Sequence, residues 1–184
     1  MRKNWCTGLV LAIVAIALAS PAGAAGKFPT KPIVLVNCMP AGGGDDRNSR
    51  AISSVAAEYL GQPLIVQIKG GGSGSIAMRH VKDAKPDGYT LGTCDQGAAS
   101  LMAVAQNLPY SPKDYVSIAN LALLPWVMVV RKDSGWNSID DFIKAAKAKP
   151  GEIVFPIAGV MSADHYPWLL FAKQAGIKGH WVNF

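Results

Sequence analysis

The stretch "PAGGGDDRNSRA" (residues 40–51) decides the fold, because it joins two segments of different periodicity. Before it, "KPIVLVNCM" (residues 31–39) is an apolar, β-branched run that predicts a buried strand. After it, apolar side chains recur at helical spacing up to Leu60, and Gly61 is placed to end that helix. The three glycines therefore mark a strand-to-helix turn at which another molecule can approach the backbone closely.

The succession of strand, glycine loop and helix occurs a second time. The segment "QPLIVQIK" (residues 62–69) predicts a strand, "GGGSGS" (residues 70–75) a glycine loop and "IAMRHVKDAK" (residues 76–85) a helix. A turn in "PDGYTLGTC" (residues 86–94) leads into a third strand. Strands that alternate with helices predict an α/β fold with a parallel sheet and right-handed crossovers.

The second half of the chain predicts a further group of elements, beyond the proline-rich connection "LPYSPKDY" (residues 108–115). Strands are expected in "PWVMVVRK" (residues 125–132), "EIVF" (residues 152–155) and "GHWVNF" (residues 179–184). Helices are expected in residues 137–151, where Ser138 is placed as the N-cap, and in residues 162–176. We therefore expect a first α/β lobe over residues 25–107 and a second over residues 108–184.

The first 24 residues show the pattern of a secretory signal peptide. Two basic residues form the n-region, "TGLVLAIVAIALA" (residues 7–19) is the apolar h-region, and Ala22 and Ala24 fit an A-x-A cleavage pattern. The apolar run is shorter than the roughly 20 residues that a membrane-spanning helix needs. We therefore predict cleavage between Ala24 and Ala25 and a periplasmic location for the remainder.

Charge and cysteine content exclude some classes of function. The formal net charge of the 184-residue chain is +6, and it falls to +4 without residues 1–24, which hold two basic residues and no acidic one. The remaining basic residues are scattered, which disfavours nucleic-acid binding. Cys38 and Cys94 lack the spacing and histidine partners of a zinc site. They lie close together if the first and third strands are neighbours, and the sequence leaves a disulfide between them open.

The two glycine loops suit an anion, since each precedes a helix N-terminus at the carboxyl edge of the predicted sheet. Neither contains the Gly-Lys-Ser/Thr of a P-loop, and Ser75 occupies the place of the third glycine of a dinucleotide fingerprint. The alternative is that both loops are only tight turns. Asp45 and Asp46 are placed to cap the helix that follows, and one of them could instead contact a ligand.

An exported α/β hydrolase is the alternative function, suggested by "SADH" (residues 162–165). Ser162 and His165 are three residues apart at an expected helix start, where the two side chains could meet. No G-x-S-x-G nucleophile elbow is present, and Asp164 is more simply an N-cap. We therefore expect no catalytic residues, no metal site and no cofactor.

Several segments together resemble one protein family. They are "PIVLVNCMPAGGGDDRNSRAIS", "LGQPLIVQIKGGGSGSIA", "KPDGYTL", "LPYSPKDY", "AKAKPGEIVF" and "SADHYPWLLF". In this order they are similar to the Bug-type periplasmic receptors of tripartite tricarboxylate transporters, from about Phe28 to Phe184. The resemblance implies a two-lobed, type II periplasmic binding-protein fold. It also implies a monomer that binds a small carboxylate between the lobes and delivers it to a membrane transporter, without enzymatic activity.

The resemblance also implies which residues bind the ligand. They lie in a first loop (residues 40–44) with the aspartate that follows, a second loop (residues 71–75), a third loop (residues 95–97) and a segment ahead of the last helix. The expected ligand-binding residues are Pro40, Ala41, Gly42, Gly43, Gly44, Asp46, Gly71, Gly72, Ser73, Gly74, Ser75, Asp95, Gln96, Gly97, Gly159, Ser162 and His165.

Two further expectations follow from the resemblance. Replacing Gly43 or Gly74 by valine is expected to abolish carboxylate binding and to leave the fold largely intact. The chain also ends well before the family normally does, so the resemblance covers the first part of a receptor. We expect the chain as given to lack the segment that returns to the first lobe and therefore not to be a competent receptor.

Overall fold

The structure, a computed structural model, describes residues 27–123 and 125–183. The predicted signal peptide and its cleavage site lie outside the described residues. Residues from Lys31 onward form one compact unit, which contains two parallel sheets. No helix in the described ranges is both long and apolar enough to cross a membrane.

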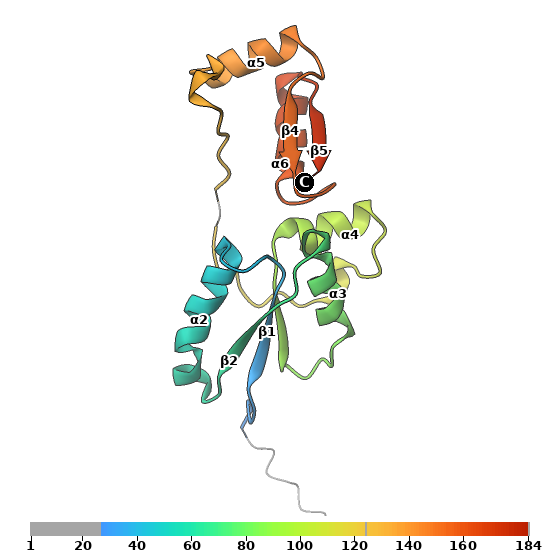
Figure 1. Cartoon of the computed structure of the whole chain (residues 1–184). Helices are drawn as coiled ribbons and strands as arrows, with labels where there is room; N and C mark the ends of the chain where they lie inside the picture. Colours follow the sequence, from blue (N-terminus) through green and yellow to red (C-terminus); the bar gives the residue numbers. More distant parts are fainter. Residues whose placement is uncertain (1–26, 124, 184) are drawn as a thin grey trace, which may run out of the picture. The chain divides into compact units, whose positions relative to one another are not determined.

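The first sheet contains the three strands that the sequence predicts. They are β1 (Ile33–Asn37), β2 (Leu64–Ile68) and β3 (Thr90–Thr93). Both neighbours of β1 run parallel to it, and the strand order is β2-β1-β3. The predicted parallel α/β arrangement and the adjacency of the first and third strands are therefore confirmed (Figure 1).

Two helices cover opposite faces of this sheet. Successive side chains of β1 point to opposite faces, and each set packs in its own apolar cluster with one of the helices. Ile33 and Leu35 of β1 pack with Ala56 of α2 (Gly44–Leu60). Val36 packs with Ala77 of α3 (Ser75–Asp83). As predicted, Gly61 ends α2 in the left-handed conformation, which glycine adopts without steric cost.

The proline-rich connection packs against the helices that follow the first sheet. After β3 the chain enters a π-helical turn (Gly97–Leu101) and the short helix α4 (Met102–Ala105). The Tyr110 hydroxyl donates to Ala98 O at 2.8 Å, and the Tyr115 hydroxyl donates to Met78 O at 2.8 Å. These bonds hold residues 108–115 against the middle of α3 and the start of the π-helical turn.

The second sheet is built from β4 (Val154–Ile157) and β5 (His180–Asn183), which pair in parallel. It packs with α5 (Ile139–Ala148) and α6 (His165–Ala175) through an aromatic core. Phe142 lies at the centre of this core, and its ring contacts those of Trp136, Phe155, Trp168 and Phe171. The predicted strands and helices of residues 137–183 are therefore confirmed.

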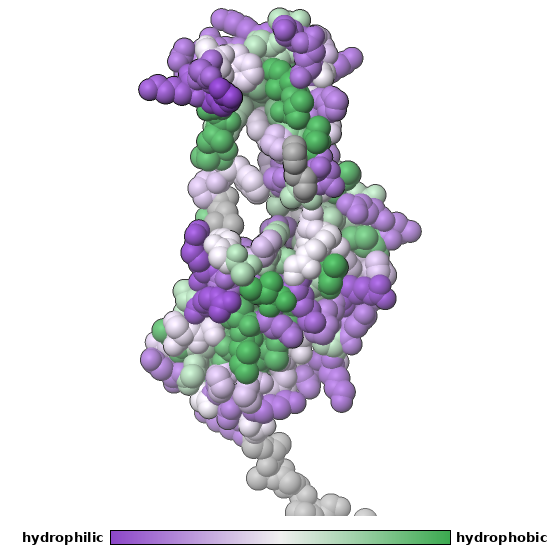
Figure 2. Space-filling model, viewed as in Figure 1, coloured by the Kyte–Doolittle hydropathy of each residue, from purple (hydrophilic) through white to green (hydrophobic). Residues whose placement is uncertain are grey.

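The prediction of a strand in residues 125–132 is wrong. A short 3-10 turn begins at Lys132, and residues 125–131 have no regular secondary structure. Their apolar side chains are exposed, including Trp126, Val127 and Val129. Figure 2 shows hydrophobic surface, in green, on the segment that leads to α5. The physical reason is that a strand needs a hydrogen-bonded neighbour, and β4 and β5 pair only with each other in the described part of the chain.

Candidate functional site

The first sheet brings three loops to one edge. β1, β2 and β3 end in register, with Asn37 opposite both Ile68 and Thr93. Because all three strands are parallel, the first, second and third loops leave from the same carboxyl edge, where ligands bind in open α/β sheets. The three loops that the sequence predicts to form the binding site therefore start at the same edge of the first sheet.

The first loop is held by the carboxylate of Asp46. Asp46 Oδ2 accepts a hydrogen bond from Gly42 N at 2.8 Å, and Oδ1 lies 2.9 Å from Arg50 Nε. The backbone bond from Gly42, followed by the Arg50 bond, lowers the pKa of Asp46. Asp46 is 4 % exposed, so its carboxylate shapes the first loop from within. The prediction that Asp46 caps α2 is wrong, because the start of α2 has no side-chain cap and Asp46 bonds to Gly42, which precedes the helix.

A buried polar network lies under the first loop, and the sequence analysis did not find it. Asn37 Nδ2 donates to Ser49 Oγ at 3.4 Å, and Ser49 Oγ lies 3.4 Å from Thr93 Oγ1. Asn37 Oδ1 accepts from Met39 N at 2.8 Å and turns the chain into the loop. The signal for this network was an asparagine at the end of an apolar strand, since a buried amide needs partners.

The second loop is a left-handed turn that packs tightly on its neighbours. Gly74 has φ +94°, and a Cβ there would lie 2.8 Å from Ala98 Cβ and 3.3 Å from Cys38 Cβ. The expectation that Gly74→Val leaves the fold largely intact is therefore wrong, because valine would be strained and would clash with packed side chains. Gly43, by contrast, has a negative φ and one close neighbour, Pro40 O at 3.2 Å.

The third loop is ordered by Asp95 and approaches the segment after β4. Asp95 Oδ1 accepts from Ala98 N at 2.8 Å, which caps the π-helical turn. A Cβ on Gly97 would lie 2.4 Å from Ala163 N, so only glycine permits this approach of two backbones. Gln96, which lies between Asp95 and Gly97 in the sequence, is exposed.

The loop between β4 and α6 (residues 158–164, the β4–α6 loop) meets the second and third loops. Ser73 Oγ donates to Ala158 O at 2.7 Å, and a Cβ on Gly159 would lie 2.6 Å from Ser73 Oγ. Gln106, at the end of α4, donates from Nε2 to Val160 O at 2.7 Å. The structure therefore brings the predicted residues of the second and third loops to the predicted segment ahead of α6.

Asp45 and Asp164 are close enough to Asp95 to affect its ionisation. Burial raises the pKa of Asp95, and the negative charges of Asp45 and Asp164 add to that effect. Asp164 Oδ2 accepts from Ala158 N at 2.7 Å, so it orders the β4–α6 loop as Asp46 orders the first loop. Asp45 and Asp164 were not among the residues expected to bind ligand.

Ser162 and His165 do not form the pair that the hydrolase alternative needs. The Ser162 hydroxyl donates to Gly159 O at 2.6 Å and also contacts Asp164 Oδ1. His165 Nδ1 accepts from Met161 N at 3.0 Å, so this nitrogen is occupied by the backbone. Burial lowers the pKa of His165, which keeps the imidazole neutral at pH 7. Both side chains therefore order the start of α6.

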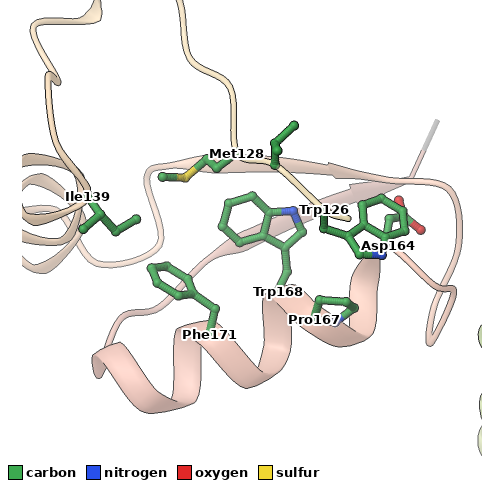
Figure 3. Close-up of a pocket in the computed structure, with 8 residues that line it drawn as sticks. Trp126, Met128, Ile139, Asp164, Pro167, Trp168 and Phe171 are labelled. Atoms are coloured by element: carbon green, nitrogen blue, oxygen red, sulfur yellow. The ribbon is translucent and has the colours of Figure 1, made fainter. Parts of the chain in front are cut away.

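A separate cavity of about 160 Å³ lies beside α6 (Figure 3). Its walls are mainly apolar and include Trp126, Met128, Trp168 and Phe171, with Asp164 at one end. Apart from residues of α6 and Asp164, it is lined by Ile139 and by the exposed segment of residues 126–128. None of the predicted ligand-binding residues lines it.

The sequence of this chain is similar to one protein family and to several curated proteins. The family described as "Tripartite tricarboxylate transporter family receptor" (TctC) matches residues 49–184. A UPF0065 protein of Cupriavidus necator is 34 % identical over 180 residues, which are 93 % of this chain and 53 % of that protein. Protein BugT of Bordetella pertussis is 29 % identical over 91 % of this chain and 53 % of its own length. The chain thus spans about half the length of the curated relatives it matches.

Two solved protein structures are also similar to this chain in sequence and in fold. MatC from Rhodopseudomonas palustris, determined with bound malate, is 26 % identical with a TM-score of 0.75, over 85 % of this chain and 54 % of that one. A TctC solute-binding protein from Polaromonas is 30 % identical with a TM-score of 0.64, over 85 % and 54 % of the two chains. The expected fold of a periplasmic binding protein is therefore confirmed, in part of its length. The family match covers most of the chain, which belongs to the tripartite tricarboxylate transporter receptors of the Bug type.

Proposed function

We propose that this protein is a periplasmic solute receptor whose first and second loops bind a small carboxylate. The family is one of transporter receptors, and two solved relatives were determined with malate and with adipate. The observation that carries the proposal is the placement of the glycine loops directly before α2 and α3. The first N–H groups of a helix lack intrahelical partners, and together with the helix dipole they favour an anion.

The arrangement of charges supports recognition by backbone groups. The Asp46 carboxylate and Arg50 are engaged with each other and with the first loop. A carboxylate would therefore be held by N–H groups of residues 43–46 and 72–75, with the β4–α6 loop closing over it. These roles and the lobe boundaries at residues 107 and 108 stay predictions.

Gly44→Val offers a sharp test, because a Cβ on Gly44 meets no atom within 4 Å and its backbone is helical. The added side chain stands at the entrance to α2 without disturbing the packing. We expect Gly44→Val to weaken malate or adipate binding at least about tenfold in isothermal titration calorimetry. Its unfolding midpoint should stay close to that of the parent.

Ala57→Val is the matched control, since it places the same side chain on an exposed position of the same helix. We expect it to bind carboxylates like the parent protein. Equal affinity of Gly44→Val and the parent would show that the N-terminus of α2 is not the site. Absence of binding of a panel of dicarboxylates, amino acids and aromatic acids by the parent would contradict the carboxylate proposal.

We further propose that the protein is exported and serves a membrane transporter as a monomer. The support is the predicted signal peptide together with the family membership. N-terminal sequencing of protein from the periplasmic fraction should begin at Ala25. Sequencing that begins at Met1 would contradict cleavage. Carboxylate uptake by cells that carry the cognate membrane subunits should depend on this protein.

A further inference from the structure

Two cysteines lie at the ends of adjacent strands, and their placement follows from the register of the sheet. β1 and β3 pair in parallel with Asn37 opposite Thr93. Cys38 directly follows Asn37, the last residue of β1, and Cys94 directly follows Thr93, the last residue of β3. Neighbouring strands lie about 4.8 Å apart, and a disulfide joins Cα atoms that are about 4.4–6.8 Å apart. The separation of the two backbones therefore suits a disulfide.

The two side chains also lie on the same face of the sheet. Cys38 belongs to the buried cluster that contains Ala77 of α3. Gly92 of β3 lies on that face too, because a Cβ there would be 2.9 Å from Val81 Cγ2 of α3. Side chains alternate along a strand, so Cys94, two residues after Gly92, is directed to the face of Cys38.

We propose that Cys38 and Cys94, which are free thiols in this structure, become an intramolecular disulfide in the exported protein. The exposed Cys94 thiolate attacks a disulfide oxidant such as oxidised glutathione, which releases one glutathione thiolate. The buried Cys38 thiolate then attacks the Cys94 sulfur and releases the second. The two protein thiols lose two protons and two electrons, and oxidised glutathione is reduced to two thiols.

The bond would brace the edge from which the proposed binding loops leave. Cys38 precedes the first loop and Cys94 directly precedes the third. A Cβ on Gly74 would lie 3.4 Å from Cys38 Sγ, so the same sulfur supports the second loop. The cross-link fixes β1 to β3 at this edge, whatever ligand the loops bind.

The environment of the thiols sets how fast the bond forms. Burial, followed by the charge of Asp45, raises the pKa of Cys38 to about 12. Cys94 is accessible at the surface, yet the partial desolvation of its sulfur, followed by the charge of Asp95, raises the pKa of Cys94 to about 11. Burial, followed by the charges of the two thiolates, raises the pKa of Tyr110. Since the thiolate is the attacking species, the rate of oxidation should rise about tenfold per pH unit between pH 7 and 9.

The test is to incubate the full chain with oxidised glutathione at pH 9, alkylate it and digest it with trypsin without reduction. Cys38 lies in the tryptic peptide of residues 28–47 and Cys94 in that of residues 83–113, while Cys6 is in neither. We expect the two peptides to appear as one cross-linked species that dithiothreitol separates. Dithiothreitol should also lower the melting temperature of the oxidised parent but not that of Cys94→Ser.

Two results would overturn the proposal. One is recovery of both peptides with alkylated cysteines after oxidation at pH 9. The other is a stable glutathione adduct on Cys94 without cross-linking to Cys38. Neither readout uses a carboxylate ligand, so the test stands apart from the proposed receptor function.

Discussion

At the scale of single residues, Gly97 determines how closely the third loop approaches the β4–α6 loop. A Cβ on Gly97 would lie 2.4 Å from Ala163 N and 2.8 Å from Ser162 C, which are backbone atoms that cannot rotate away. We expect Gly97→Val to lower the free energy of unfolding by about 2 kcal/mol or more, because one of the two backbones must shift. Urea denaturation monitored by tryptophan fluorescence measures this loss.

Gly44→Ala is the control for the Gly97 prediction. No atom lies within 4 Å of a Cβ on Gly44, and its backbone is helical, so alanine there should keep or slightly raise stability. If Gly97→Val unfolds at the same urea concentration as Gly44→Ala, the third loop and the β4–α6 loop do not pack in solution as they do here.

Asp46 makes stability dependent on pH in a defined direction. The backbone N–H of Gly42, then Arg50, lowers the pKa of its carboxyl below the usual value of 3.8. The ionised form therefore stabilises the folded protein above about pH 4, and this stabilisation is lost as the pH falls through the lowered pKa. We expect Asp46→Asn to reduce the melting temperature at pH 7 and to differ less from the parent at pH 3.

Asp83→Asn is the matched control for the pH dependence. Asp83 and Arg79 form an ion pair of 3.5 Å with both side chains exposed, and such pairs contribute little. Its melting temperature should follow that of the parent at both pH values. An Asp46→Asn difference that is as large at pH 3 as at pH 7 would contradict the assignment of the effect to the Asp46 charge.

At the scale of elements, α5 is the helix whose start the sequence specifies most fully. Ser138 Oγ accepts from Asp141 N at 3.2 Å, and Asp141 Oδ2 accepts from Asn137 N at 3.1 Å. We expect Ser138→Ala to lower the free energy of unfolding by about 1 kcal/mol, since one helix N–H loses its acceptor. Thermal denaturation followed by circular dichroism measures it.

Ser54 of α2 provides the comparison. Its hydroxyl bonds to Ala51 O within the helix and is exposed, so Ser54→Ala removes no cap. We expect its stability to equal or exceed that of the parent. A loss of about 1 kcal/mol in both variants would show that the measured effect is not specific to helix capping.

At the scale of the whole molecule, the segment between the two sheets exposes apolar side chains that a helix or sheet would usually bury. Val127 and Val129 are 78 % and 84 % exposed, and Met128 between them is 36 % exposed. Met128 and, at its rim, the exposed Val127 line the cavity of Figure 3. We expect Val127→Lys with Val129→Lys to reduce aggregation, measured by light scattering on warming, because they remove exposed apolar area. Stability should change by less than about 0.5 kcal/mol.

Met128→Lys is the control for the surface substitutions. Its side chain faces Ile139 and Trp168, so a charge there should destabilise the packing of α5 and α6. If Met128→Lys reduces aggregation as much as the double valine variant and also leaves the free energy of unfolding unchanged, the segment does not pack against α5 and α6 in solution.

The sequence by itself determined the order and type of the strands and longer helices, but it did not predict the π-helical turn and α4 in residues 97–105. Alternating apolar runs, glycine loops and the cap at Ser138 act within a few residues, so they are readable without tertiary contacts. The strand predicted in residues 125–132 failed because β-structure depends on a partner strand, which local pattern cannot supply.

Only the tertiary structure decided which residues of the candidate site contact one another. The family resemblance implied that Asp46, Gly74 and Gly97 contact the ligand, with helix capping as the alternative for Asp46. The structure shows one holding the first loop and two permitting close packing, because their neighbours come from distant segments. The hydrogen bond between Asn37 and Ser49 could not be predicted for the same reason. It forms because β1 packs against α2, and the local sequence does not show which elements pack together.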